Sequence, residues 1–197
     1  MYVKDSDARL RLLEAGMQEF LEFGYSHASL RRICSRAGLT TGAVYSCFQN
    51  KEDLFCAIVE DTAKGLSYRM RTSYEAECQD ASLSVPNDVQ MIGFLWHHRD
   101  EVMLLLEGAA GTRYASFLSS LEKEMVEMFS AFFLCHAGQE IDHDLVSIIV
   151  KMRLKSHIET LKCGYSLEKT MEIEKNLSQY SNAGFQKLIE NTRNKKN

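Results

Sequence analysis

The sequence predicts an all-α fold, and three observations support this. Only one proline occurs in 197 residues. The strong helix formers Leu, Ala, Glu, Lys and Met are abundant. No clear run of alternating polar and apolar residues, which would indicate a strand, is present. With 45% hydrophobic and 25% charged residues, the composition is that of a globular chain long enough for one large domain or two small ones.

Residues 24–51 predict two short helices joined by a tight turn, followed by the start of a third. Ser29 and Thr40 stand at N-cap positions, where a hydroxyl can accept an orphan backbone N–H. Gly38 lies between them and tolerates the positive φ of a sharp turn. The apolar residues after Ser29 recur at the spacing of one helix face: Leu30, Ile33, Cys34 and Ala37. Helix, glycine turn and helix is the helix-turn-helix pattern.

The charge of this segment differs from that of the rest of the chain. It contains no Asp or Glu, and its net charge is +4, whereas the whole chain carries −4. The positive residues are Arg31, Arg32, Arg36 and Lys51. A basic face in an acidic chain suits phosphate binding. The alternative is an ordinary three-helix packing unit with surface arginines.

The segment resembles the DNA-binding domain of tetracycline-repressor-like (TetR family) regulators over roughly the first 60 residues. Three blocks carry the resemblance, followed by the start of the next helix. They are Phe20, Gly24 and Tyr25; Ile33, Cys34, Ala37, Gly38 and Leu39; Gly42, Tyr45 and Phe48; then Lys51, Glu52 and Leu54. The sequence departs from the family at Cys34, where Ala is usual, and at Cys47, where His or Tyr is usual.

The resemblance implies that residues 40–47 form a recognition helix whose amino-terminal residues enter the major groove. The short side chains of this helix could contact base edges, and Gly42 would let the backbone approach the DNA closely. Tyr45 and Lys51 would bind phosphates, as in the family. The expected DNA-binding residues are Ser29, Thr40, Thr41, Gly42, Ala43, Tyr45, Ser46 and Lys51. Tyr45 as a half-buried aromatic and Thr40 as a pure cap are the alternatives.

Two longer helices flank the motif. Residues 8–23 form the first, ended by Gly24, with an inward stripe of Leu10, Leu13, Met17, Phe20 and Leu21. Residues 50–74 form the other, capped by Asn50, with Leu54, Phe55, Ile58 and Leu66 inward; in the family this helix connects head and body. Residues 1–7 are expected to be a loose polar lead-in, with Lys4 a weak candidate for a minor-groove arm. Residues 78–88, which contain Pro86, are expected to be a loop.

The body begins with a helical segment at 89–96, a break at 97–100 and a second segment at 102–106. Gly108 and Gly111 mark a turn before a long amphipathic helix from about 112 to 136. Its Met and aromatic residues are either plain core or the lining of a small-molecule cavity, which the family usually has there. The expected effector pocket comprises Phe94, Trp96, Met103, Phe117, Leu121, Met125, Phe129 and Met152.

The carboxyl-terminal part predicts a helical hairpin after a loop at 138–142. The helix at 142–162 is apolar on two sides, and Ser166 caps a last helix that leads to a basic frayed tail at 191–197. Two such hairpins would form a four-helix bundle, as in the family. The expected dimer interface comprises Leu145, Ile149, Met152, Met171, Leu177, Tyr180, Gly184 and Leu188. An ordinary hairpin in a monomer is the alternative.

Other classes of function find little support. Among His97, His98, Cys135 and His136, no pair has the i, i+4 spacing that would let one helix face hold a metal, so no metal and no cofactor are expected. No nucleophile–base pair, carboxylate pair or phosphate loop suggests an enzyme. The six cysteines show no paired spacing and read as free thiols. No signal peptide or membrane span is predicted, so we expect a cytoplasmic location without a membrane partner.

Together these features predict a DNA-binding head at residues 1–53 and an effector-binding and dimerisation domain at 54–197. The expected protein is a homodimeric transcriptional regulator, specifically a repressor released from a palindromic operator by a small-molecule effector. Its partners would be double-stranded DNA, a second copy of itself and an unidentified small molecule. A dimeric helical DNA-binding protein with an architectural or non-transcriptional role is the alternative.

Overall fold

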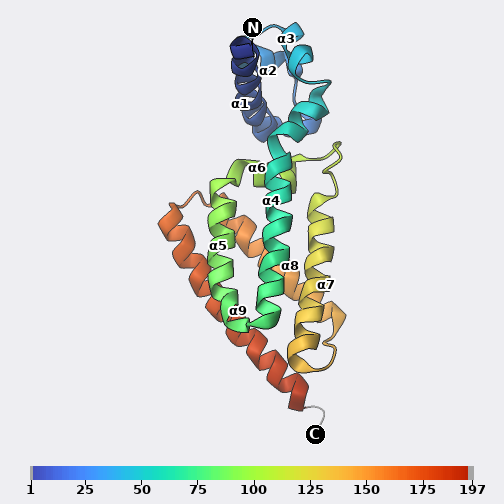
Figure 1. Ribbon diagram of the computed structural model, residues 1–197, viewed down its shortest axis with the longest axis vertical. Coiled ribbons are helices and arrows are strands. Elements are labelled where there is room, and N and C mark those ends of the chain that lie inside the picture. Colours follow the sequence, from blue (N-terminus) through green and yellow to red (C-terminus); the bar gives the residue numbers. More distant parts are fainter. Residues whose placement is uncertain (1, 195–197) are drawn as a thin grey trace. The chain divides into compact units, whose positions relative to one another are not determined.

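The structure is a computed structural model that describes the backbone of residues 2–194 and the side chains of residues 7–194. Over this range all regular structure is helical, which confirms the predicted all-α fold (Figure 1). The helices are α1 Tyr2–His27, α2 Leu30–Ala37, α3 Thr41–Cys47, α4 Lys51–Gln79, η1 Ala81–Leu83, α5 Ser84–His97, α6 Arg99–Met103, the π-helical turn η2 Leu104–Gly108, α7 Phe117–Ala137, α8 His143–Lys162 and α9 Leu167–Asn194.

The chain divides into two compact units. The first consists of Met1–Gly65 and His98–Leu118, and the second of Leu66–His97 and Ser119–Asn197. Helix α4 therefore contributes to both. The predicted boundary at residue 53 concerns function rather than packing, and it stays a prediction.

The first unit has a core drawn from α1 to α4 and from η2. Its largest fully buried apolar side chains are Leu12, Phe20, Ile33, Leu54, Phe55, Leu104 and Leu105. Phe20, Tyr25 and Phe55 meet edge to face or tilted, with ring centroids 5.2–5.9 Å apart. Val44 of α3 is fully buried. Burying side chains of this size contributes about 1.5–3 kcal/mol each.

Helix α1 differs from the prediction in its length and in its buried face. It begins at Tyr2, and its backbone leaves the helical conformation at Gly24, with φ 69° and ψ 163°, where the sequence predicted its end; a further turn then continues to His27. Leu10 is 57% exposed and Leu21 is also exposed, so the predicted stripe was partly wrong. The reason is Gly16: a Cβ there would lie 3.2 Å from Ile58 Cδ1, so α1 and α4 approach closely at this point. Lys4 and Met1 lie outside the described side chains.

The predicted loop at 78–88 is wrong, because only Asp80 lies outside the helices there. The Asp80 carboxylate accepts the Ser82 N–H at 2.9 Å and starts η1. Pro86 lies in the first turn of α5, where a missing N–H costs nothing. Helix α7 begins at Phe117 rather than near 112, because Thr112 Oγ1 accepts the Tyr114 N–H and holds the chain in turns.

The second unit contains buried polar side chains between its helices. Asp88 of α5 accepts hydrogen bonds from Arg153 of α8 and from Ser178 of α9. His157 Nδ1 lies 3.2 Å from the buried Glu174 carboxylate. The predicted loop at 138–142 and the Ser166 cap are confirmed, the latter with Lys169 N–H at 3.3 Å from Ser166 Oγ. The predicted frayed tail is wrong up to Asn194, which still belongs to α9, and residues 195–197 lie outside the described part.

Candidate nucleic-acid interface

The turn between α2 and α3 has the geometry that the sequence predicted. Gly38 adopts the left-handed conformation, with φ 64° and ψ 35°. Its N–H donates to the Ser35 carbonyl, and the Leu39 N–H donates to the Cys34 carbonyl at 2.9 Å. These bonds satisfy carbonyls at the end of α2 and let α3 start within a few residues.

The outer face of α3 is exposed and polar. Thr40, Thr41, Gly42 and Ser46 are exposed, and Tyr45 is 65% exposed. Ala43 is half-buried, beside the fully buried Val44. Thr40 occupies the N-cap position, but its hydroxyl makes no capping bond. The face is therefore available to a partner, and the DNA-contact roles of its residues stay predictions.

Lys51 has a structural task in addition to its predicted one. Its Nζ donates to the Tyr25 carbonyl at 2.7 Å and to the Ala28 carbonyl at 3.0 Å, and it lies 4.4 Å from the centroid of the Tyr25 ring. Burial lowers the pKa of Lys51, and the nearby Glu19 carboxylate opposes this shift. Because an ammonium group has three donors, one remains for a phosphate.

Ser29 also lies at its predicted N-cap position, at the start of α2, without a side-chain capping bond. Its backbone N–H instead donates to Glu19 Oε1 of α1 at 2.9 Å. The carboxylate thus satisfies one of the orphan donors of α2 in place of the serine hydroxyl.

The arginines of the basic segment are less free than their number suggests. Arg32 Nε donates to Glu19 Oε1 at 2.6 Å, and Arg36 pairs with both Glu22 and Glu19. Adding these two carboxylates of α1 to the segment's +4 leaves a local charge of +2. The sequence count covered residues 24–51 alone and missed partners that lie earlier in the chain.

Arg31 is a further candidate contact, which the sequence analysis counted in the basic segment but did not place among the expected DNA-binding residues. It is the second residue of α2, its side chain is exposed, and it has no ion-pair partner among residues 7–194. Arg9 of α1 stands with its guanidinium carbon 5.2 Å from the centroid of the Phe48 ring, directly after α3. The signal for Arg31 was its place beside the helix N-terminus, where phosphates bind.

The residues of the predicted effector pocket are divided between the two compact units, and the pocket stays a prediction. Met103 and Phe117 belong to the first unit, and the other six belong to the second. Phe129 packs on Phe185 with ring centroids 5.6 Å apart. Met152 is 62% exposed, which argues against a place in the wall of a cavity within the chain. The remaining members, Leu121, Met125, Phe94 and Trp96, are buried or half-buried.

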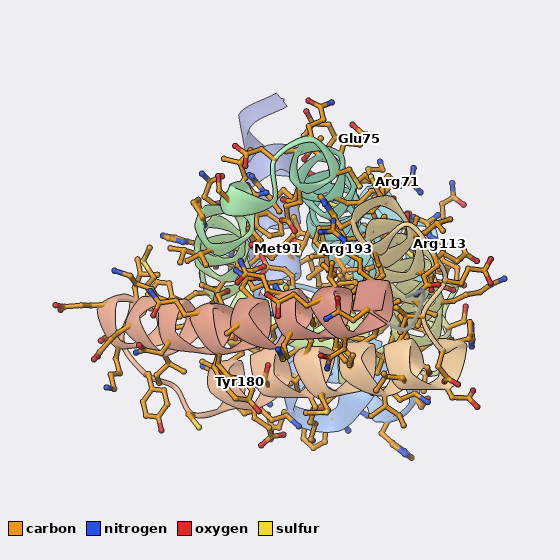
Figure 2. All side chains as sticks on the ribbon, turned by 90° about the horizontal axis from the view of Figure 1, so that it is seen from below. Arg71, Glu75, Met91, Arg113, Tyr180 and Arg193 are labelled. Atoms are coloured by element: carbon orange, nitrogen blue, oxygen red, sulfur yellow. The ribbon has the colours of Figure 1, made fainter. Side chains whose placement is uncertain are left out.

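The predicted dimer residues include several that are exposed in the single chain. Tyr180 of α9 is 75% exposed, and Figure 2 shows it at the surface beside α8 and α9. Met152, Leu145 and Gly184 are also exposed. Ile149, Met171, Leu177 and Leu188 are half-buried. Ile148, which the sequence reasoning omitted, is 55% exposed and lies on α8 between Leu145 and Met152.

The candidate metal ligands are engaged separately. His97 Nδ1 lies 2.7 Å from the Gly93 carbonyl oxygen, and His136 Nε2 lies 3.3 Å from that of Glu77. Among the described residues, no three His, Cys, Asp or Glu side chains gather closely enough to hold a metal ion. None of the helices within that same range combines the length and apolarity that a membrane crossing requires.

Residues 12–58 match the sequence profile of bacterial regulatory proteins of the tetR family. These residues form a TetR-family domain. The match contains α2 and α3 entirely, with most of α1 and the first turns of α4. The resemblance inferred from Gly24, Gly38, Tyr45 and Lys51 is thereby confirmed.

Curated relatives of the TetR-family domain are named as regulators. The HTH-type transcriptional regulator AcrR of Shigella flexneri is 31% identical over 83 residues, which cover 42% of this chain and 38% of AcrR. The HTH-type transcriptional repressor AcnR of Corynebacterium glutamicum is 35% identical over 60 residues, which cover 30% of this chain and 32% of AcnR. The match therefore spans about a third of the length of these relatives.

Solved structures extend the likeness beyond the TetR-family domain, at the level of fold. A transcriptional regulator (TerR/AcrR family) from Aquifex aeolicus VF5 has a TM-score of 0.61 at 20% identity, covering 88% of this chain and 98% of its own. NalD, the secondary repressor of the MexAB-OprM multidrug efflux pump in Pseudomonas aeruginosa, has a TM-score of 0.53 at 21% identity, covering 90% and 96%. FadR from Bacillus subtilis, in complex with stearoyl-CoA, has a TM-score of 0.52 at 14% identity, covering 86% and 96%.

Proposed function

We propose that this protein is a homodimeric transcriptional repressor that binds a palindromic operator through α3 and is released by a small-molecule effector. The observation that carries the proposal is the exposed polar face of α3 in a TetR-family domain. Thr41 and Tyr45 project from a short helix held by Val44 and the Gly38 turn, so this face can enter a major groove without rearrangement. The names of the relatives, which include several repressors, support the regulatory role.

The DNA-binding part of the proposal can be tested without knowing the operator. Selection from a random duplex library should enrich a palindromic sequence, and fluorescence anisotropy should then measure its affinity. Thr41→Ala with Tyr45→Ala should weaken binding at least tenfold, because two contacts of about 1–2 kcal/mol each are lost. Tyr68→Ala is the matched control, since Tyr68 is 70% exposed on α4. Equal affinities for both variants would show that α3 is not the reading face.

The dimeric part rests on the exposed apolar side chains of α8. Ile148 and Met152 lie four residues apart and therefore share one helix face, which a second copy would cover. Ile148→Asp with Met152→Asp should weaken self-association more than 100-fold, because two carboxylates would be buried without partners. Analytical ultracentrifugation measures this. A wild-type chain that sediments as a monomer at micromolar concentration contradicts the proposal.

The regulatory part is tested by the genomic distribution of binding. Occupancy at one or a few promoters supports a repressor, whereas occupancy dispersed over the genome would instead support an architectural role. The effector is proposed to be a small molecule because NalD and FadR, which share the fold, are respectively the repressor of a multidrug efflux pump and a regulator crystallised with stearoyl-CoA.

A further inference from the structure

Glu19 is a fully buried carboxylate within the DNA-binding unit. It lies on α1, on the same buried face as Phe20 and Leu12. A buried carboxylate without partners is strongly unfavourable, so the groups around Glu19 must compensate for its lost hydration. Its surroundings therefore determine what the nearby cations are free to do.

Positive groups surround this carboxylate. Oε1 accepts the Arg32 Nε–H at 2.6 Å together with the Ser29 backbone N–H at 2.9 Å. Oε2 makes no hydrogen bond and lies 3.5 Å from Arg36 Nε, within ion-pair distance. The Lys51 ammonium group is close enough to feel the same charge. Two of the four basic residues in the segment 24–51, Arg32 and Arg36, thus pair with one acid, and Arg36 pairs with Glu22 as well.

The same carboxylate fixes the beginning of α2. The Ser29 hydroxyl makes no capping bond, so the Glu19 oxygen is the acceptor at the helix N-cap. In a helix-turn-helix the first helix crosses the DNA backbone, and phosphates bind near its N-terminus. Glu19 thus forms ion pairs inside the protein with Arg32 and Arg36, which would otherwise be available to a DNA phosphate.

We propose that Glu19 is a positioning residue for DNA recognition that limits sequence-independent binding by holding Arg32 and Arg36 on the protein. This inference rests on the proposed function. Phosphate contacts supply nearly all non-specific affinity, and each contact adds about 0.9 to the slope of log affinity against log salt. Because Arg32 and Arg36 are held by an internal acid, the non-specific affinity for DNA is reduced. The contacts of α3 then determine which sequence is bound.

The test uses the full-length chain and a DNA duplex of about 30 base pairs and arbitrary sequence. Affinity is measured from about 50 to 200 mM salt, a range over which affinity due to phosphate contacts falls steeply. Glu19→Gln keeps an oxygen for the Ser29 N–H but removes the charge. It should raise affinity at low salt about three- to tenfold and steepen the salt slope by about 1–2, since one or two arginines become available to phosphates. Glu14→Gln is the control, because Glu14 is an exposed acid on the same helix.

Arg36→Gln provides a second measurement should Glu19→Gln fail to fold. Glu19 keeps its bonds to Arg32 and Ser29 in this variant, so the unit should remain folded. The salt slope should change by less than about 0.5, because Arg36 is already held. If Arg36→Gln lowers the salt slope by about 1, or if Glu19→Gln is indistinguishable from Glu14→Gln, this inference is overturned while the proposed function still stands. A wild-type chain that binds no duplex at low salt overturns the proposed function as well.

Discussion

The exposed helix faces of the two units have opposite chemistry. In the first unit, α3 presents the exposed residues Thr41, Tyr45 and Ser46, whose hydroxyl groups can donate and accept hydrogen bonds. In the second unit, α8 presents Ile148 and Met152, which have no polar group to offer. Polar groups exposed on a short helix suit a hydrated nucleic-acid groove, whereas exposed aliphatic side chains suit a second protein surface.

The interiors of the units also differ, in the way they hold charge. In the first unit Glu19 is buried, but its partners Arg32 and Arg36 reach the surface and are about half and one third exposed. In the second unit both Arg153 and Asp88 are largely buried. The partly exposed arginines of the first unit are therefore accessible to an anion from outside, whereas the buried Arg153–Asp88 pair of the second unit holds its own helices together.

Removing the buried guanidinium group of Arg153, in the second unit, should have the largest effect on stability. Arg153→Met leaves the Asp88 carboxylate buried with only the Ser178 hydroxyl, which should lower the free energy of unfolding by about 3–5 kcal/mol. Lys151→Met is the control, since Lys151 pairs with Glu122 at the surface, where such pairs contribute about 0–1 kcal/mol. Urea unfolding followed by circular dichroism measures both. Equal losses would mean that Arg153 is no more structural than a surface lysine.

In the first unit, removing the Lys51 ammonium group should have an intermediate effect on stability. Lys51→Met leaves the Tyr25 and Ala28 carbonyls without their donor and should cost about 1–3 kcal/mol of unfolding free energy. Lys64→Met on the same helix removes an exposed pair with Glu60 and should have a much smaller effect, because water screens such pairs. If Lys51→Met unfolds at the wild-type urea concentration, its interior bonds contribute nothing and its charge is free for phosphates.

Local chemistry explains why the sequence predicted the helix-turn-helix well. The Gly38 turn, the buried Val44 and the Asn50 cap, whose Oδ1 accepts the Asp53 N–H at 2.9 Å, each depend on residues a few positions apart. Such interactions are visible in a sequence because their geometry is fixed by the backbone itself.

The parts that the sequence did not reveal depend on distant partners. Glu19 reaches Arg32 across 13 residues, and Lys51 reaches Tyr25 across 26. Asp88, assigned to a loop, lies in α5 and meets Ser178 across 90 residues. One-face periodicity misplaced the buried side of α1 because Gly16, an apparently neutral residue, packs tightly against Leu54 and Ile58 of α4. Charge counts along a segment fail for the same reason, since folding brings in acids from elsewhere.

The smallest expected effect is a dependence of stability on pH that should arise in the second unit. Glu77 of α4 is largely removed from water, and this desolvation raises the pKa of its carboxyl above the ordinary 4.5; the Asp88 carboxylate acts in the same direction. The folded state therefore binds the proton more tightly than the unfolded state. The resulting stabilisation is complete below pH 4.5 and is lost as the pH rises through the higher, folded-state pKa.

Glu77→Gln should abolish this loss, because the amide keeps an oxygen for the Asn87 side chain, which donates to Glu77 Oε1 at 2.9 Å, and never ionises. The unfolding free energy of the wild type should fall relative to that of Glu77→Gln as the pH rises from 4.5, and the difference should level off above the raised pKa. Glu75→Gln is the control, since Glu75 is exposed on the same helix (Figure 2). A difference between wild type and Glu77→Gln that stays constant with pH would show that this carboxyl is as well hydrated as an ordinary surface acid, and that Arg153 and Asp88 form the buried charge of the unit without it.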